Sequence, residues 1–338
     1  MKNLISNFPQ HIIDAIAICN NTKLKKNNNN ISNIIICGMG GSGIAAKIVF
    51  DHVKNKIKLP YYINKDYKLP GFVNKKSLVV VCSYSGNTEE ALSCFKEAIK
   101  NNSEICCISS GGILLKQAIK RGFNYMSLPK GNPPRTMIAF AIILLFNVLN
   151  HYSIFKINVE SVFKMVFKSL DKSKVNKIKS DAKKLSDKIY TTLPIVYSSD
   201  NISGIGVRLK QQLNENSKIL CIQSTVPEMN HNEILGWTLN KKSLLNKIPV
   251  NKFSIIFLRN NSELKRNQIR LNILKKELTK INRKNIFEVT SKGGSMFEEM
   301  FYLIHLCDWV SYFLALKHKI DPINIDAINM FKKELSRY

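Results

Sequence analysis

The sequence predicts two doubly wound α/β domains, in which helices cover both faces of a parallel sheet. Short β-branched runs alternate with longer amphipathic segments, which is the pattern of parallel strands joined by crossover helices. The alternation occurs twice along 338 residues, and folded domains have roughly 100–200 residues each. We therefore expect one domain over residues 1–152 and a second over residues 153–338.

The first domain is expected to contain five strands and several covering helices. The strands are the β-branched runs Ile34–Cys37, Pro60–Ile63, Leu78–Cys82, Ile105–Ile108 and Tyr125–Leu128. The amphipathic segments between them predict the helices Gly43–Val53, Thr88–Lys100 and Leu114–Arg121. The segment Arg135–Leu149 is apolar on nearly every side, which indicates a buried helix.

The second domain repeats this order of elements. A lysine-rich stretch over residues 158–188 has apolar residues at helical spacing and predicts the crossover into it. The expected strands are Pro194–Tyr197, Lys218–Ile222, Phe253–Leu258 and Asn285–Val289. The expected helices are Gly204–Asn214, Leu264–Ile281, Ser295–Lys317 and Asn324–Leu335. The pair Asp321-Pro322 ends the third of these helices before the fourth begins.

The composition indicates a cytoplasmic protein with no membrane or nucleic-acid partner. The formal net charge is +27, but the excess lysine is spread along the chain among asparagine and isoleucine, as a strongly AT-biased coding sequence would produce. The eight cysteines lack C-x-x-C spacing and predict small buried side chains in a reducing compartment. The apolar stretch 137–149 is shorter than the about 20 residues that span a bilayer. The N-terminus lacks the apolar core of a signal peptide.

Two loops carry the functional signal. Residues 38–43, Gly-Met-Gly-Gly-Ser-Gly, follow an expected strand and open a helix, which is the weak G-x-G-x-x-G pattern of dinucleotide sites. Residues 83–88, Ser-Tyr-Ser-Gly-Asn-Thr, stand between a buried strand and a helix. Three hydroxyls beside the N–H groups of a helix start suit a phosphate monoester, whereas a simple helix cap is the structural alternative.

These loops resemble those of the sugar isomerase (SIS) domain, whose flavodoxin-like, doubly wound sheet binds phosphosugars. The resemblance narrows to the bifunctional phosphoglucose/phosphomannose isomerases. The segments that carry it are Pro134-Arg135, Leu213–Lys218, Pro227–Trp237 and Cys307–Tyr312. It implies two SIS domains and the interconversion of glucose 6-phosphate, and of mannose 6-phosphate, with fructose 6-phosphate. The implied proton transfer passes through a cis-enediol without a metal or other cofactor.

The resemblance also implies a role for each site residue. The phosphate would be bound by Gly41, Ser42, Ser83, Ser85 and Thr88. Glu215 matches the catalytic base, and His231 matches the ring-opening residue that a second subunit shares across a homodimer interface. Arg135 would stabilise the enediolate. Lys332 matches a lysine near the substrate, although Lys333 beside it fits as well. Ile323 and Asn324 follow Asp321-Pro322 where relatives commonly carry threonine, which favours glucose over mannose activity.

Three alternatives remain open on the sequence. A non-catalytic phosphosugar-binding regulator would use the same fold but would leave Glu215 and His231 without a purpose. A dehydrogenase would use the glycine loop to bind a nicotinamide cofactor. A basic nucleic-acid-binding protein would bind duplex DNA with a steep dependence on salt.

Overall fold

The computed structural model describes residues 1–26, 30–237 and 249–337. These residues form two compact units. The N-terminal unit is Ser6–Asp171, and the C-terminal unit is Lys172–Tyr338 together with Met1–Ile5. Among the described residues, no helix combines the length and apolarity that crossing a bilayer requires.

The compact units differ from the domains expected over 1–152 and 153–338. The helix α7 (Val159–Ser169) belongs to the N-terminal unit. Its Phe163 is fully buried, with its ring centroid 5.8 Å from that of Phe146 in α6. This apolar contact draws α7 into the first unit, whereas the lysine-rich helix α8 (Lys172–Ile189) begins the second.

The N-terminal unit is built on a five-stranded parallel sheet with the order β2-β1-β3-β4-β5. The strands are β1 (Asn33–Cys37), β2 (Tyr61–Asn64), β3 (Ser77–Cys82), β4 (Glu104–Ser109) and β5 (Asn124–Ser127). The helices are α2 (Phe8–Asn21), α3 (Gly40–Val53), α4 (Glu89–Lys100), α5 (Gly112–Arg121) and α6 (Ile138–His151), with α7 after them. The short helix α1 (Lys2–Ser6) belongs to the C-terminal unit except for its last residue. All five predicted strands are confirmed to within two residues. The helix α2 was not expected.

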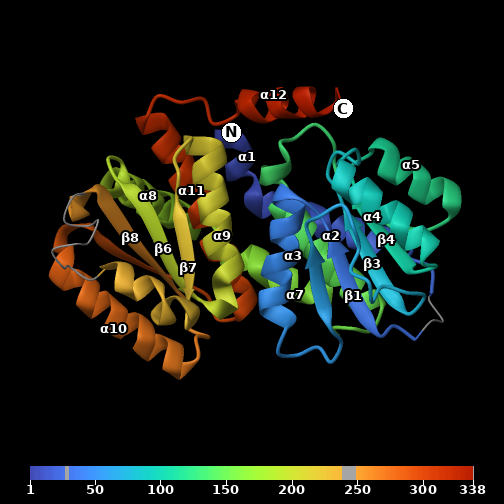
Figure 1. Cartoon of the computed structure of the whole chain (residues 1–338), viewed down its shortest axis with the longest axis horizontal. Helices are drawn as coiled ribbons and strands as arrows, with labels where there is room; N and C mark the ends of the chain where they lie inside the picture. Colours follow the sequence, from blue (N-terminus) through green and yellow to red (C-terminus); the bar gives the residue numbers. More distant parts are fainter. Residues whose placement is uncertain (27–29, 238–248, 338) are drawn as a thin grey trace. The chain divides into compact units, whose positions relative to one another are not determined.

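Both faces of this sheet are covered by helices (Figure 1). The strands β1 and β3 are buried at every position, so successive side chains enter the core on alternate faces. Ile35 and Val79 join one apolar cluster with Phe95 of α4 and Leu114 of α5. The other face packs on α3 and α6. The sheet is therefore doubly wound, as predicted.

The C-terminal unit repeats the arrangement with a four-stranded parallel sheet of order β7-β6-β8-β9. The strands are β6 (Leu193–Ser199), β7 (Ile222–Val226), β8 (Phe253–Arg259) and β9 (Ile286–Thr290). The helices after α8 are α9 (Ser203–Gln212), α10 (Lys265–Ile281), α11 (Met296–Lys317) and α12 (Asp326–Leu335). The helix α10 packs on one sheet face, and α9 and α11 lie on the other side (Figure 1).

The strand expected over Lys218–Ile222 is wrong, because the observed strand lies about one strand length later in the sequence. A π-helical turn, Leu213–Ser217, follows α9, and Lys218 then adopts a left-handed backbone with φ 57°. A residue in this conformation ends a helix and cannot extend a strand. The strand β7 therefore starts at Ile222, where the expected one ended.

Candidate functional site

The two sequence loops lie together at the switch point of the N-terminal sheet. The strand order β2-β1-β3-β4-β5 reverses its direction between β1 and β3, which makes this position the switch point. Ligands of open α/β sheets bind at the carboxyl ends of the strands at such a point. The glycine loop follows β1 and the serine loop, residues 83–88, follows β3. A Cβ atom added to Gly38 would lie 3.0 Å from the Cys82 carbonyl oxygen, so the two loops start in contact.

The serine loop is held in a fixed conformation by its own hydroxyls. The Oγ of Ser83 and the Oγ1 of Thr88 are 2.8 Å apart, and Ser83 Oγ accepts the N–H of Gly86 at 3.1 Å. Gly86 has φ +69°, and a Cβ there would lie 1.9 Å from the Gly111 carbonyl oxygen. Ser85 is exposed, and its Oγ accepts the Asn87 N–H at 3.2 Å. The loop thus presents hydroxyls and N–H groups at the start of α4.

The first turn of α3 supplies further donors beside this loop. Met39 precedes the helix and gives no side-chain cap, and the first N–H groups of any helix lack partners within it. Gly41 and Ser42 belong to this turn and are half-buried. An added Cβ on Gly41 would lie 3.2 Å from the Pro134 carbonyl oxygen. Glycine at this position therefore lets the helix approach the turn that carries Arg135.

Tyr84 ties that turn to the serine loop. Its hydroxyl donates to the Pro129 carbonyl oxygen at 2.8 Å and accepts the Asn132 N–H at 3.0 Å. Arg135 follows in a short 3-10 helix, Pro134–Thr136, and is buried. Residues 41–42, 83–88 and 135 are therefore brought together within the N-terminal unit. The sequence motif contained Tyr84, but its position between two hydroxyl residues gave no signal of this clamp.

The other predicted site residues belong to the C-terminal unit. Glu215 lies in the π-helical turn after α9 and is half-buried. The residues that flank it are fastened to α11: Asn216 Nδ2 donates to Ser311 Oγ at 2.9 Å, and Ser217 Oγ donates to the Ser311 carbonyl oxygen at 2.7 Å. The turn that carries Glu215 is therefore fixed on one side by a buried helix.

A buried ion pair supports the same contact between α9 and α11. One guanidinium nitrogen of Arg208 donates to both carboxylate oxygens of Asp308, at 2.7 and 2.8 Å. Gln212 Nε2 donates to Asp308 Oδ1 at 2.8 Å. Burial raises the pKa of Asp308, and the charge of Arg208 opposes that rise. This cluster was not predicted from the sequence, in which its one signal is the i, i+4 spacing of Arg208 and Gln212.

His231 ends a short 3-10 helix, Glu228–His231, and its side chain is exposed. The segment around it is fixed by a buried set of polar contacts. Tyr197 donates through its hydroxyl to Glu233 Oε1 at 2.6 Å and accepts from Trp237 Nε1 at 2.8 Å. Glu228 accepts from Asn232 at 3.0 Å. Both glutamates therefore fasten the segment by bonds to residues other than His231.

Lys332 and Lys333 lie on α12, which has no buried residue. Both side chains are exposed, so the structure gives no reason to prefer one of them. Among residues 1–26, 30–237 and 249–337, no group of three or more His, Cys, Asp or Glu side chains is arranged to hold a metal ion. All eight cysteines are free and buried, as the sequence predicted.

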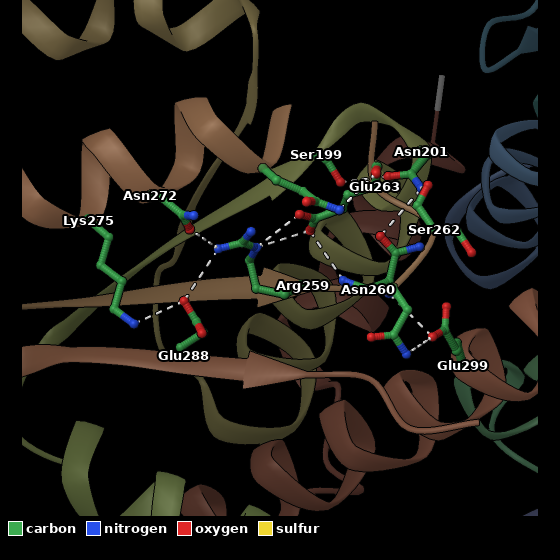
Figure 2. A network of polar contacts seen from close by, with 12 residues as sticks. Ser199, Asn201, Arg259, Asn260, Ser262, Glu263, Asn272, Lys275, Glu288 and Glu299 are labelled. Carbon is green, nitrogen blue, oxygen red and sulfur yellow. Dashed lines mark hydrogen bonds and ion pairs between the residues drawn. The ribbon is translucent and has the colours of Figure 1, made fainter. Parts of the chain in front are cut away.

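The C-terminal sheet has its own switch point, between β6 and β8. Two carboxylates of the protein accept N–H groups of the loop after β8 there (Figure 2). Glu263 Oε1 accepts the Asn260 N–H at 3.2 Å, and both oxygens of Glu263 accept from Arg259 Nε. Glu299 Oε1 accepts the Asn261 N–H at 3.3 Å. Burial raises the pKa of Glu263, and Arg259 counteracts the rise. The N–H groups of Asn260 and Asn261 are therefore already bonded to carboxylates of the protein.

Comparisons with known proteins agree with this geometry. Residues 178–335 match the bacterial phospho-glucose isomerase C-terminal SIS domain family. A bifunctional phosphoglucose/phosphomannose isomerase of Aquifex aeolicus (strain VF5) is 36% identical over 306 residues, covering 90% of this chain and 91% of the relative. The enzyme of the same name from Caldicellulosiruptor bescii is 34% identical, covering 99% of each chain.

Solved structures share the fold at much lower identity. The C-terminal domain of glucosamine-fructose-6-phosphate aminotransferase from Francisella tularensis superposes with a TM-score of 0.69 at 15% identity. The match covers 95% of this chain and 96% of that one, and it shows that the two chains share a fold. Together with the similarity over nearly the full length to curated relatives, these findings show that the chain belongs to the family of bifunctional phosphoglucose/phosphomannose isomerases.

Proposed function

We propose that this protein is an aldose–ketose isomerase that interconverts glucose 6-phosphate, and mannose 6-phosphate, with fructose 6-phosphate. The observation that carries the proposal is a family membership that extends over nearly the whole chain, joined to a hydroxyl-rich loop at the N-terminal switch point. The same metal-free chemistry would serve both aldoses, because they differ only in configuration at C2.

The phosphate would bind at the N-terminal switch point. Its oxygens need several donors, and the hydroxyls of Ser42, Ser83, Ser85 and Thr88 with the N–H of Gly41 supply them. Holding the phosphate fixes the far end of the substrate and so restricts where C1 and C2 can lie. Arg135, on the turn clamped by Tyr84, would offer a fixed cation to the enediolate oxygen.

Proton transfer would require groups of the C-terminal unit. His231 would donate a proton to the ring oxygen and accept one from the C1 hydroxyl, which opens the ring. The Glu215 carboxylate would then take the proton from C2 and return it to C1 through a cis-enediolate. Lys332 would add a positive charge near the substrate.

The exposed position of His231 supports a shared site in a homodimer. Its segment is anchored from within by Glu233 and Trp237, whereas His231 itself is exposed to solvent. A second copy of the chain could therefore receive this side chain in its own site. Activity would then depend on association, in a cytoplasmic enzyme that acts on sugar phosphates in glycolysis or gluconeogenesis.

The proposal is tested by supplying fructose 6-phosphate to protein treated exhaustively with a chelator and identifying both aldose products. Full activity is expected, and in D₂O deuterium should enter C2 of the aldose. Glu215→Gln should lower kcat by about 10²–10⁴-fold, because it removes the base but keeps the side-chain size. Glu228→Gln, which only weakens a contact with Asn232, is the matched control.

Three results would contradict the proposal. If Glu215→Gln turned over normally while Glu228→Gln did not, the base would be Glu228. Phosphosugar binding without any turnover by the wild-type protein would instead identify a binding regulator. Activity lost on chelation and restored by zinc would exclude the metal-free mechanism.

A further inference from the structure

Lys218 has an unusual position directly after the Glu215 turn. Its backbone is left-handed, with φ 57° and ψ 34°, a conformation that normally selects glycine or asparagine at a helix end. A lysine there gains nothing from its backbone. The distinctive feature of this lysine is the set of contacts that its side chain makes.

The ammonium group of Lys218 binds three backbone carbonyl oxygens. Its Nζ donates to the Glu215 oxygen at 2.5 Å, to the Asn324 oxygen at 2.7 Å and to the Asp321 oxygen at 3.5 Å. An ammonium has three N–H donors and no acceptor, so this set of acceptors suits it. The first carbonyl belongs to the turn of the proposed base, and the other two belong to the segment that leads into α12.

That segment, residues 321–326, shapes its own backbone with side-chain turns. Asp321 Oδ1 accepts the Ile323 N–H at 2.8 Å, and Asn324 Oδ1 accepts the Asp326 N–H at 2.9 Å. These turns leave the carbonyl groups of Asp321 and Asn324 directed to the same ammonium. The helix α12 follows with no buried residue, so its position depends strongly on how this segment is held.

We propose that Lys218 is a positioning residue that couples the turn of Glu215 to the segment carrying α12 and Lys332. The ammonium of Lys218 binds the backbone of the Glu215 turn and the backbone of the C-terminal segment at the same time, and this bridge is called the link below. The catalytic part of this inference rests on the proposed function, whereas the link itself does not.

The test compares three variants. Lys218→Met removes the ammonium and keeps the stem, and Lys218→Gly removes it while suiting the left-handed backbone. Lys319→Met is the matched control, because Lys319 also has φ 57°, is exposed and adjoins the same segment. No hydrogen bond of its ammonium is found among the described residues, in contrast to Lys218.

Hydrogen exchange and steady-state kinetics give the two readouts. Both Lys218 variants should exchange amides of residues 321–335 at least about fivefold faster than the wild type. Both should lose about tenfold or more in kcat with KM changed less than about threefold, because a displaced base affects chemistry more than phosphate binding. Lys319→Met should match the wild type in both measurements.

The outcomes separate the parts of the inference. Wild-type exchange in Lys218→Gly would overturn the link, since this variant removes the ammonium without straining the backbone. Faster exchange with unchanged kcat would overturn the coupling to Glu215. If the wild-type protein lacked isomerase activity but the exchange difference remained, the proposed function would fail and the link would stand.

Discussion

Breaking the buried pair of Arg208 and Asp308 should strongly destabilise the C-terminal unit. The side chains are 2% and 5% exposed, and their atoms are 2.7 Å apart. Arg208→Met would leave the Asp308 carboxylate buried with Gln212 as its remaining donor in this network. Removing one partner of a buried pair costs about 3–5 kcal/mol, because the other charge stays desolvated.

The expected shift in Tm follows from that cost. At about 2–4 °C per kcal/mol for a unit of this size, Arg208→Met should lower Tm by roughly 6–20 °C. The double variant Arg208→Met with Asp308→Leu removes both charges, so it should be more stable than Arg208→Met alone. It should still be less stable than the wild type, since Gln212 loses its acceptor, a loss of about 1–3 kcal/mol.

Thermal unfolding followed by circular dichroism measures these shifts. The matched control is the pair Lys280 and Glu277, 2.6 Å apart but with side chains 62% and 47% exposed. Lys280→Met should cost less than about 1 kcal/mol. Equal shifts for Arg208→Met and Lys280→Met would refute the argument from burial. A double variant as unstable as the sum of its singles would refute the argument from an uncompensated charge.

Three further changes test other parts of the molecule. Thr88→Ala should raise KM for phosphosugars about tenfold with a smaller effect on kcat, because it removes a remote binding group; unchanged kinetics would exclude the loop from the site. Tyr84→Phe frees the turn before Arg135, so kcat should fall at least about threefold while Tm stays within a few degrees. Burial lowers the pKa of His305 to about 3, and its Nε2 accepts from Trp309 at 3.1 Å. Between about pH 3 and pH 6.5 only the unfolded state binds this proton, so stability is lost as pH falls through this range, by about 1.4 kcal/mol per pH unit. Denaturant unfolding of His305→Gln should show a correspondingly shallower pH dependence.

The sequence predicted the fold well because central strands such as β1 and β3 are buried on both faces. A run such as residues 34–37 is apolar at every position, and only a covered parallel strand uses such a run in this context. The loops at the N-terminal switch point were predicted for the same reason, since each directly follows such a strand. Local pattern therefore identified the elements and the two loops at the N-terminal switch point.

The errors arose where a side chain from elsewhere in the chain determines the backbone. The π-helical turn at Glu215 is held by Ser311, nearly a hundred residues later, and no local signal announces it. The strand expected at Lys218 failed because the π-helical turn ends there in a left-handed residue, whose ammonium binds two carbonyl groups more than a hundred residues later. The clamp at Tyr84 depends on Pro129, which lies 45 residues later in the sequence.

The carboxylates at the C-terminal switch point affect how freely the sequence of the loop after β8 can change in evolution. If the halves descend from one duplicated ancestor, Glu263 and Glu299 now occupy the place of a bound anion with groups that never dissociate. A ligand stabilises a protein only while it is present, whereas these internal anions stabilise their loops permanently. The loop after β8, residues 260–263, has thus become part of the scaffold, and its sequence can drift under selection for folding alone.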